Sequence, residues 1–371
     1  MMSARFLTVV LERAFNMRDG FGREIDYMRI SVIDSCNLNC YYCNPCDNNE
    51  HCHALNILSV KEVLCIVRAA TRLGIKHFRL TGGEPLLHPQ LDEMVLQIKK
   101  IPGVSSVSLT TNAVLLAQHA KWLKEAGIDS INVSLDTIDA SEYERITKKP
   151  LLEEVKHGIN AAIECGIRVK INVVLTPQTD VVALTRYVAK KGTDIRFIEM
   201  MPVGEGHTNG VEPYKKVIGT LSKLYGEPCR INTEKTKEIN SGNDKRKIPD
   251  NGPAEYYIFP ELGIRVGLIQ AIHGKFCDTC NRIRVTADGR LMPCLGSSVT
   301  MDLVPDSWDF ADDVEKDFAI VRALRAAIKA KPRCHNFNDN VVTYTKTTET
   351  KTTEIEAAEV NAARNMSRIG G

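Results

Sequence analysis

The chain has 371 residues, of which 43% are hydrophobic and 25% are charged, as in an ordinary globular protein that buries a large core in one big domain and a smaller one. Its formal net charge of +2 gives no general attraction to nucleic acid or to an anionic membrane surface, so an anionic ligand needs a local group of cations. No apolar stretch approaches the roughly 20 residues that a membrane-spanning helix requires. We therefore expect neither nucleic acid nor a membrane as a partner.

The twelve cysteines and the lack of a signal peptide indicate a reducing compartment, the cytoplasm, where thiols bind metals more often than they form disulfides. The first 23 residues contain several arginines, as a transit peptide would, but Glu12 and Asp19 argue against that role. We expect these residues to form a short helix that caps the domain.

Expected strands and helices alternate from residue 28 to residue 200. The first helix is expected at 60–73, with Ser59 as its N-cap and Gly74 at its C-terminal end. The other helices are expected at 90–100, 115–126, 152–165 and 181–190, and the strands at 28–33, 77–81, 105–110, 130–135, 168–175 and 194–200. Strands separated by helices in this way imply βαβ units and a parallel sheet.

A parallel sheet of this kind can close in two ways. A doubly wound sheet binds its ligand at a switch point, whereas a barrel collects functional groups from the C-terminal ends of many strands. Polar residues stand at or just after four expected strand ends, at Asp34, Thr81, Thr110 and Asp136. This pattern favours an α/β fold with a partial (β/α)6 TIM-type barrel.

The chain beyond residue 202 is less regular. Residues 232–251 are polar and rich in lysine, which is typical of an exposed loop. Residues 256–269 contain strand-like runs. The Thr/Lys/Glu run at 343–353 is of a kind that is more often mobile than packed.

A C-x3-C-x2-C motif made of Cys36, Cys40 and Cys43 directly follows the first expected strand. Three thiolates supply one ligand fewer than the four irons of a 4Fe-4S cluster require, so one iron would remain open to another ligand. A structural zinc site is the alternative, and it would need a fourth ligand. The candidates for that ligand are Cys46, His51, Cys52 and His53. The spacing, the neighbouring Tyr42 and the preceding strand favour the cluster.

The segment Thr81-Gly82-Gly83-Glu84-Pro85 ends the second expected strand. Glycine has no Cβ and therefore lets a ligand approach the backbone closely. The alternative is a plain turn between a strand and a helix. The position of the segment, at a strand end after the cysteine motif, favours a ligand site.

A second group of three cysteines lies in the last third of the chain, at Cys277, Cys280 and Cys294. The alternative is again zinc, completed here by His273. Arg282 and Arg284, between the second and third cysteines, fall on the same face of an extended segment. Arginine suits bidentate contact with phosphate, so a metal beside this pair indicates substrate binding rather than scaffolding.

Taken together, these motifs resemble the radical S-adenosylmethionine (SAM) superfamily and, within it, the GTP 3′,8-cyclase family of molybdenum cofactor biosynthesis. The resemblance runs from about Gly22 to Met201, resumes from Gly252 to Leu295 and returns at the terminal Gly370-Gly371. The chain departs from the family at Ala113, where glycine is usual, and at Ser35, where arginine usually precedes the first cysteine.

The resemblance implies a division into a radical SAM barrel at residues 1–203 and a C-terminal Fe-S-binding domain at residues 204–371. It implies SAM and two 4Fe-4S clusters as cofactors. In the family a 5′-deoxyadenosyl radical removes hydrogen from the ribose C3′ of GTP, and C3′ then bonds to C8 of guanine. The product is (8S)-3′,8-cyclo-7,8-dihydroguanosine 5′-triphosphate.

Matched residue by residue, the resemblance also implies a role for each motif. The first cluster would be held by Cys36, Cys40 and Cys43, and the second by Cys277, Cys280 and Cys294. SAM would contact Tyr42, Gly83, Ser134 and Met201. GTP would contact Arg29, Arg79, Thr110, Lys170, Arg282 and Arg284, with Arg196 as a further candidate. Catalysis would involve the first three cysteines, Arg282, Arg284 and the tail glycines Gly370 and Gly371, which reach into the active site in the family. The cysteines without a family counterpart are Cys46, Cys52, Cys65, Cys165, Cys229 and Cys334, and we expect them to be core or surface thiols.

The implied partners are GTP as substrate, a flavodoxin- or ferredoxin-type reductant and the downstream cyclic pyranopterin monophosphate synthase, and a homodimer is an open alternative for the assembly. Two rival functions remain. A peptide-modifying radical SAM enzyme with an auxiliary cluster usually has more than three cysteines near its C-terminus. An iron-sulfur electron carrier or a zinc-stabilised scaffold would have saturated metal sites and no reason for a glycine-lined ligand site.

Overall fold

A computed structural model of the chain describes residues 17–43, 56–203, 210–231, 252–297, 299–303, 313–335, 337, 346–348 and 351–353. Within these residues, one mixed sheet runs in the order β12-β11-β10-β1-β2-β3-β4-β5-β6-β9-β8-β7. Its centre is a set of six parallel strands. They are β1 (Tyr27–Ser31), β2 (His77–Thr81), β3 (Ser106–Thr111), β4 (Ser130–Ser134), β5 (Val169–Val174) and β6 (Asp194–Ile198).

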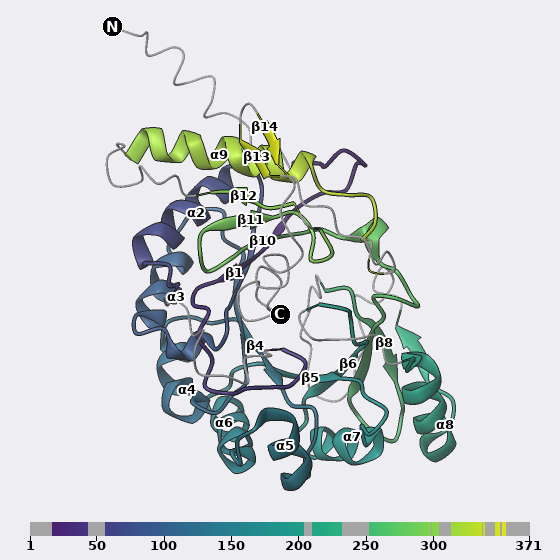
Figure 1. Cartoon of the computed structure of the whole chain (residues 1–371). Helices are drawn as coiled ribbons and strands as arrows, with labels where there is room; N and C mark the ends of the chain where they lie inside the picture. The colour runs from purple at the N-terminus through teal and green to yellow at the C-terminus, as the bar shows by residue number, and fades with distance from the viewer. Residues whose placement is uncertain are drawn as a thin grey trace, which may run out of the picture.

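The central strands curve around the middle of the molecule, and helices form the layer outside them (Figure 1). The outer helices are α2 (Val60–Arg72), α3 (Leu91–Lys99), α4 (Leu116–Glu125), α5 (Ala140–Thr147), α6 (Leu152–Glu164) and α7 (Val181–Lys190). Among the described strands the sheet ends at β12 and β7, so the barrel is open on one side. The predicted partial (β/α)6 barrel is confirmed, and each boundary of the helices and strands predicted between residues 28 and 200 falls within two residues of the observed one.

Side chains alternate between the two faces of each central strand. In β1, Met28 and Ile30 are fully buried in the core shared with the helices. Because successive strand residues point to opposite faces, Tyr27 and Arg29 point into the barrel instead. The same alternation buries Phe78 and Leu80 of β2 against the helices and turns the residues between them inward. The apolar side chains therefore pack on the outer face of the sheet, against the helices, and the polar side chains lie on the inner face, toward the barrel interior.

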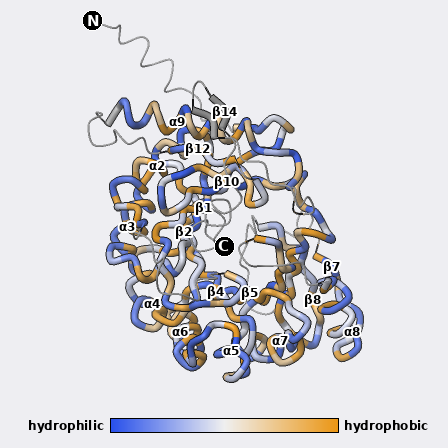
Figure 2. Tube along the Cα trace, viewed as in Figure 1, coloured by the Kyte–Doolittle hydropathy of each residue, from blue (hydrophilic) through white to orange (hydrophobic). Residues whose placement is uncertain are grey.

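The outer helices are amphipathic, and α2 shows why they begin where they do. The Ser59 side chain accepts a hydrogen bond from the backbone N–H of Glu62, and the Glu62 carboxylate accepts one from the backbone N–H of Ser59, which forms a capping box. Polar and apolar residues alternate along the outer helices in Figure 2. Each helix thereby presents one apolar stripe to the sheet.

Strands from the C-terminal part of the chain extend both edges of the barrel. β10 (Arg282–Val285) pairs in parallel with β1, and β9 (Arg265–Ile269) pairs in parallel with β6. Antiparallel strands continue outward from these two. They are β11 (Arg290–Met292), β12 (Met301–Asp302), β8 (Glu255–Ile258) and β7 (Cys229–Ile231). The two cysteine groups are therefore carried on neighbouring parts of one sheet.

Several shorter elements complete the described structure. They are the 3-10 turns η1 (Pro85–Leu87) and η3 (Cys277–Thr279), the π-helical segment η2 (Tyr214–Ile218), the helices α8 (Gly219–Tyr225) and α9 (Asp313–Lys329), and the hairpin strands β13 (Lys346–Thr348) and β14 (Lys351–Thr353). Helix α9 packs against α2, where Arg72 pairs with Asp317 at 2.7 Å. None of the described helices is long and apolar enough to cross a bilayer.

Some sequence expectations fall outside the described residues, and others need correction. Residues 1–16, the loop at 232–251 and the tail glycines Gly370 and Gly371 lie outside the described residues. The expected N-terminal helix does not extend over 17–23, where Arg18 forms a bridge with Glu24. The run at 343–353, expected to be unpacked, contains the paired strands β13 and β14.

Helix α5, which the sequence analysis missed, supports the first cysteine loop. Its last turn offers carbonyl groups that no further helical turn can use. The backbone N–H of Asn39 donates to the Thr147 carbonyl at 3.0 Å, and that of Tyr41 donates to the Ile146 carbonyl at 3.1 Å. The loop between β1 and α2 is therefore attached to a helix more than 90 residues further along the chain.

The packing of α6 on α4 can be tested with two glycines. A Cβ added to Gly158 of α6 would stand 2.3 Å from the Ala113 carbonyl oxygen, whereas a Cβ on Gly219 of α8 would meet no atom within 4 Å. We expect Gly158→Ala to lower the free energy of unfolding by about 1–3 kcal/mol through overpacking. Gly219→Ala, the same chemical change at an open helical position, should raise it by about 0.4–1 kcal/mol. Urea unfolding measures both, and a neutral Gly158→Ala would contradict the close packing.

The support that α5 gives to the cysteine loop can be tested at its N-cap. Asp139 accepts a hydrogen bond from Glu142 N–H at 2.8 Å, and Asp180 at the start of α7 accepts one from Ala183 N–H at 2.9 Å. Replacing either aspartate by alanine should cost about 1 kcal/mol. Only Asp139→Ala should also lower the iron retained after anaerobic reconstitution, because only α5 holds the cysteine loop. Equal iron contents in the two variants would show that α5 does not matter to the loop.

Candidate functional site

The first cysteine motif lies in the loop after β1, and its three thiols are half-buried. Burial raises the pKa of Cys36 to about 11 and that of Cys43 to about 12, and burial followed by the charge of Cys43 raises that of Cys40 as well. The backbone N–H of Leu38 donates to Cys36 Sγ over 3.5 Å. The three sulfur atoms therefore share a poorly hydrated site, where thiolates need a positive partner such as iron.

Gly83 lies directly against the cysteine loop. A Cβ on it would stand 2.1 Å from the Ser35 carbonyl oxygen and 2.6 Å from that of Asp34. Its N–H donates to the Ile33 carbonyl at 2.7 Å, and the N–H of Glu84 donates to that of Ser35 at 2.8 Å. Glycine is thus required by the packing of the loop on the end of β2, whereas we had expected a close approach to a ligand. The N–H of Gly83 is used within the chain, and a ligand amino group, as a hydrogen-bond donor, would bind the Gly83 carbonyl oxygen.

Glu84 is fully buried and accepts three hydrogen bonds. The donors are Thr111 Oγ1 at 2.7 Å, Asn112 N–H at 2.7 Å and Leu86 N–H at 3.0 Å. Burial raises the pKa of Glu84 to about 7. Asn112 in turn donates from Nδ2 to Asn37 Oδ1 in the cysteine loop at 2.7 Å. This chain of hydrogen bonds joins β2, β3 and the loop, and the sequence analysis gave Glu84 no such role, although an acidic residue beside a glycine pair at a strand end was a usable signal.

The backbone of Ala113 shows why glycine is usual at this position in the family. It is fully buried and has a φ of 66°, in the left-handed region. Glycine is favoured there because an L side chain is strained by roughly 1–2 kcal/mol. Thr111 Oγ1 accepts a hydrogen bond from the Ala113 N–H at 3.0 Å and helps to hold this conformation.

The other residues expected to contact SAM lie at the same edge of the barrel. Tyr42 Oη donates to Asp136 Oδ2 at 2.5 Å, and the Val174 N–H donates to Asp136 Oδ1 at 2.7 Å. Burial raises the pKa of Asp136 to about 6. Ser134 is exposed at the end of β4, and Met201 is half-buried after β6. The structure therefore gathers these residues around the C-terminal ends of β1, β2, β4 and β6.

A row of arginines crosses the inner face of the sheet. Arg29 lies in register with Arg79 of β2 on one side and with Arg284 of β10 on the other. Burial, followed by the charge of Arg284, lowers the pKa of Arg29 well below its usual range, and burial with Arg282 lowers that of Arg284 to about 10. Arg282 Nε is buried and has no hydrogen-bond partner among the described residues. Such a set of crowded cations suits a polyanion held away from water.

Two further residues expected to contact GTP continue this row around the barrel. Arg79 Nη1 lies 3.4 Å from Thr110 Oγ1. The register then leads from Thr110 to Asn132 of β4 and on to Lys170 of β5. Lys170 Nζ donates to Tyr256 Oη at 3.4 Å. All six residues expected to contact GTP therefore lie on the inner face of one curved sheet, and Tyr256 is a neighbour that the sequence analysis missed.

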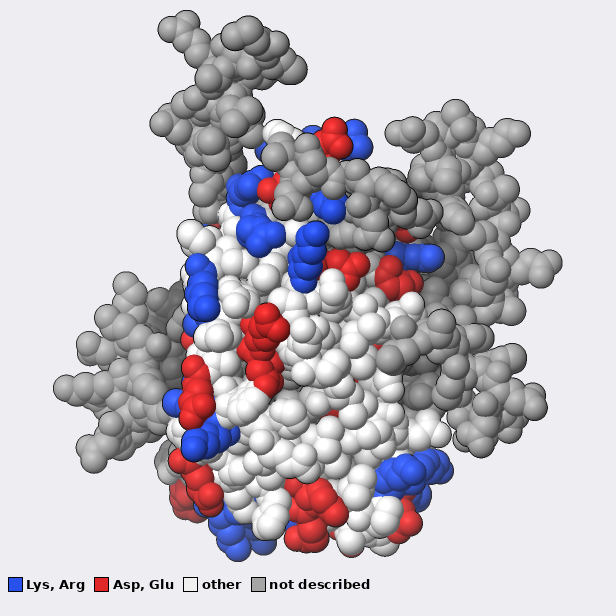
Figure 3. Space-filling model, turned by 90° about the vertical axis from the view of Figure 1, so that its left-hand side faces the viewer, with Lys and Arg blue, Asp and Glu red and all other residues white. Residues whose placement is uncertain are grey.

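Arg196, the additional candidate, also lies on this inner face. Its Nε donates to Asn172 Oδ1 on the neighbouring strand β5 at 3.0 Å, and its Nη2 has no partner among the described residues. The outer surface differs, because lysine, arginine, aspartate and glutamate are interspersed with uncharged residues on the face shown in Figure 3. The local group of cations that an anionic ligand needs is therefore inside the barrel.

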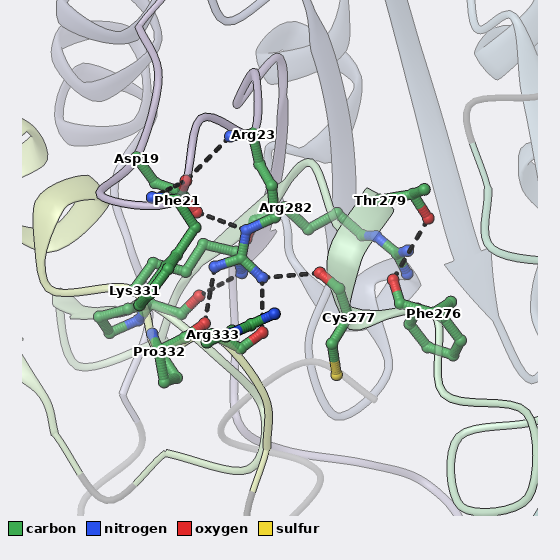
Figure 4. Close-up of polar contacts among 11 residues, drawn as sticks. Asp19, Phe21, Arg23, Phe276, Cys277, Thr279, Arg282, Lys331, Pro332 and Arg333 are labelled. Carbon is green, nitrogen blue, oxygen red and sulfur yellow. Dashed lines mark hydrogen bonds and ion pairs between the residues drawn. The ribbon is translucent and has the colours of Figure 1, made fainter.

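The second cysteine group lies beside this row. Burial raises the pKa of Cys277, which has the backbone N–H of His335 and the thiol of Cys334 as neighbours. Burial would also raise the pKa of Cys280, but the charges of Arg282 and Lys331 outweigh it and lower that pKa. Cys334, expected to be an unrelated thiol, is exposed yet lies next to Cys277. Figure 4 shows Cys277 among the cations and backbone groups that surround this turn.

Neither zinc alternative has a preformed geometry in the described part of the chain. His273 Nδ1 contacts Glu199 Oε1, and the backbone N–H groups of Ile272 and His273 bind Glu199 Oε2, so Glu199 holds this histidine. The other zinc candidates, Cys46, His51, Cys52 and His53, lie outside the described residues. No three His, Cys, Asp or Glu side chains in the described segments are arranged to hold a metal ion, and this is true of both cysteine triplets as well. What the structure shows is thiols gathered in a shared environment.

Comparison with known families matches both parts of the chain. Residues 30–183 match the Radical SAM superfamily, and residues 193–337 match Molybdenum Cofactor Synthesis C. Among solved structures, Streptococcus suis SuiB bound to S-adenosylmethionine is similar at a TM-score of 0.54 and 15% identity, over 81% of this chain and 68% of that chain. At this identity the likeness shows the fold alone, and it does not favour the peptide-modifying alternative.

Two curated relatives are much closer in sequence. The GTP 3′,8-cyclase of Clostridium perfringens (strain SM101) is 35% identical over 324 residues, which cover 86% of this chain and 95% of the relative. The GTP 3′,8-cyclase of Peptoclostridium acidaminophilum is 37% identical over 328 residues, which cover 86% and 94%. With this coverage and a radical SAM barrel, the chain belongs to the GTP 3′,8-cyclase family.

Proposed function

We propose that this protein converts GTP into (8S)-3′,8-cyclo-7,8-dihydroguanosine 5′-triphosphate, the first step of molybdenum cofactor biosynthesis. The observation that carries the proposal is the row of Arg79, Arg29 and Arg284, in register on three adjacent strands, of which Arg284 is buried and the other two are half-buried. A row of like charges inside a barrel suits a multiply charged anion, and a triphosphate is one. The family relationship identifies the nucleotide.

Cys36, Cys40 and Cys43 would hold the first 4Fe-4S cluster, and their shared burial fits such a group. When bound, the cluster and SAM supply a carbon radical that can accept a hydrogen atom. Gly83, Tyr42, Ser134 and Met201 would bind SAM from the four strand ends around it. The chain's own contribution is to hold the loop, through Gly83 and the Glu84 hydrogen bonds.

Cys277, Cys280 and Cys294 would hold a second 4Fe-4S cluster, with one iron left open to the guanine edge. The triphosphate would lie against Arg29, Arg79, Arg282 and Arg284, and Thr110 and Lys170 would contact the nucleotide further around the barrel. We propose the division into a barrel at 1–203 and a C-terminal domain at 204–371 on this basis. The two cysteine groups would then face the same substrate from opposite sides.

The atoms of the reaction balance as follows. A bond between C3′ and C8 requires loss of a hydrogen atom from C3′. Gain of one electron and one proton then completes the product, which is an isomer of GTP. Releasing the carbon radical from SAM takes one further electron, so each turnover needs two electrons, and both would come from a flavodoxin- or ferredoxin-type reductant. The arginines would hold the nucleotide so that its ribose faces the SAM site and its base can reach the ribose.

Other parts of the proposal concern the setting of the enzyme. We propose that Gly370 and Gly371 enter the active site, where residues without side chains take little space. The product would pass to the downstream cyclic pyranopterin monophosphate synthase. The many reduced cysteines favour the cytoplasm as the site of action, and a homodimer is one assembly to be tested.

The division of labour between the two cysteine groups can be tested by single substitutions. Cys36→Ala should abolish SAM cleavage, because the first cluster loses a ligand. Cys294→Ala should keep measurable formation of 5′-deoxyadenosine but lose cyclisation of GTP. Chromatography of both products after anaerobic reconstitution distinguishes the variants. Equal residual cyclase activity in the two would contradict separate roles.

The phosphate role of the arginine row can be tested at Arg282. Arg282→Gln should weaken GTP binding about 10- to 100-fold, since a charge-assisted hydrogen bond contributes roughly 1.5–3 kcal/mol. Arg290→Gln is the matched control, because Arg290 lies on the adjacent strand β11, half-exposed and near Asp288 and Asp302. Equilibrium dialysis with labelled GTP measures both. Unchanged affinity in Arg282→Gln would count against the phosphate site.

A further inference from the structure

Arg23 is a buried arginine that joins three distant parts of the chain. Its Nε donates to Asp19 Oδ2 at 2.5 Å within the N-terminal segment. Its Nη1 donates to the Cys277 carbonyl at 2.6 Å and to the Arg333 carbonyl at 3.0 Å, and its Nη2 donates to the Pro332 carbonyl at 2.6 Å. Figure 4 shows the guanidinium between these carbonyl groups.

Lys331 reaches the same cysteine segment from the end of α9. It is 2% exposed, and its Nζ donates to the carbonyl oxygens of Arg282 and Pro293, each at 2.8 Å. Arg282 lies two residues after Cys280, and Pro293 directly precedes Cys294. Arg23 and Lys331 together therefore bind a backbone carbonyl at or close to each of the three cysteines.

Both cations are placed where a charge is costly. A buried ammonium or guanidinium group loses hydration, and it is stable only when fixed acceptors replace the lost water. Asp19 balances Arg23, whereas Lys331 has no carboxylate partner among the described residues; its side chain contacts two backbone carbonyls and the Cys280 thiol. Three thiolates on a metal cluster nearby would supply negative charge at this position.

The three thiols lie on a short turn and at the adjoining ends of two paired strands, because β10 and β11 run antiparallel and bring Cys280 and Cys294 to the same end of their hairpin. Cys277 begins the short turn η3, Cys280 precedes β10 and Cys294 follows β11. Cys280 and Cys294 both lie beyond the paired residues of this hairpin, so further contacts are needed to fix their positions. The two cations bind this segment from outside, one from the N-terminal part of the chain and one from the C-terminal part.

We propose that Arg23 and Lys331 are positioning residues that preorganise Cys277, Cys280 and Cys294 to receive the second cluster. This inference rests on the proposed second cluster and adds which residues hold its cysteines in place. Neither residue touches the substrate in this account. Arg23 acts through the backbone that carries the cysteines, and Lys331 acts through that backbone and through its contact with the Cys280 thiol.

The test compares Arg23→Met and Lys331→Met with the wild type after anaerobic reconstitution. The wild type should hold about eight irons per chain, four for each 4Fe-4S cluster. Each variant should hold about half of that iron, lose the electron paramagnetic resonance signal of the second cluster and retain SAM cleavage at the first. Arg72→Met is the matched control, because Arg72 also ties α9 to the barrel through Asp317 but is half-exposed. It should keep both clusters.

Two more conservative substitutions keep the test valid if the methionine variants do not fold. Arg23→Lys keeps the charge but cannot span all the carbonyl groups, and Lys331→Gln keeps a donor without charge. In each, the metal-free protein should show faster alkylation of Cys277, a thiol that is 8% exposed, while urea unfolding stays close to that of the wild type.

The outcomes separate the two claims. Variants with both clusters, an unchanged resonance signal and unchanged alkylation would overturn the positioning role and leave the proposed function intact. A wild type that holds only the first cluster would overturn the second cluster, and with it this inference.

Discussion

The structure depends on the burial of several like charges on the inner face of one sheet. Arg29 stands between Arg79 and Arg284, and burial, followed by the charges of neighbouring arginines, lowers the pKa of both Arg29 and Arg284. The apolar residues on the other face of the same strands must offset this cost through their packing against the helices. A fold that accepts such a penalty at its centre gains by binding an anion there, since the ligand relieves the repulsion. The outer face of each strand therefore stabilises the fold, and the charged inner face destabilises it in return for ligand binding.

Around this row, the chain holds its reactive parts by backbone contacts rather than by large side chains. The first cysteine loop lies on Gly83, is joined to β3 through Glu84 and Asn112, and is attached to the end of α5. The second cysteine segment is bound at its carbonyl groups by Arg23 and Lys331. Strands β9 and β10 fasten the C-terminal part of the chain to both edges of the barrel. The two cysteine groups thus share one rigid frame, as a reaction that joins two parts of one substrate requires.

Local patterns in the sequence predicted most of the helices and strands of the barrel, but they did not predict which distant strands pair with each other. The helix from Val60 was predictable because its cap and its apolar period lie within a short window, and the capping box of Ser59 and Glu62 is present. Helix α5 was missed because it is short, although Asp139 and Glu142 carry a capping pattern. The pairing of β10 with β1 joins segments about 250 residues apart, and no local period encodes that register. The same distance hides Arg23 and Lys331, which look like ordinary surface cations until the fold brings them to Cys277 and Pro293.

The central claim is that this barrel forms a bond between C3′ and C8 of GTP. Its most direct test uses GTP labelled with deuterium at C3′, incubated anaerobically with the reconstituted protein, SAM and a reductant, and followed by chromatography and mass spectrometry. The account predicts deuterium in 5′-deoxyadenosine and a new GTP isomer that has lost the label. Unlabelled 5′-deoxyadenosine together with intact GTP would contradict it.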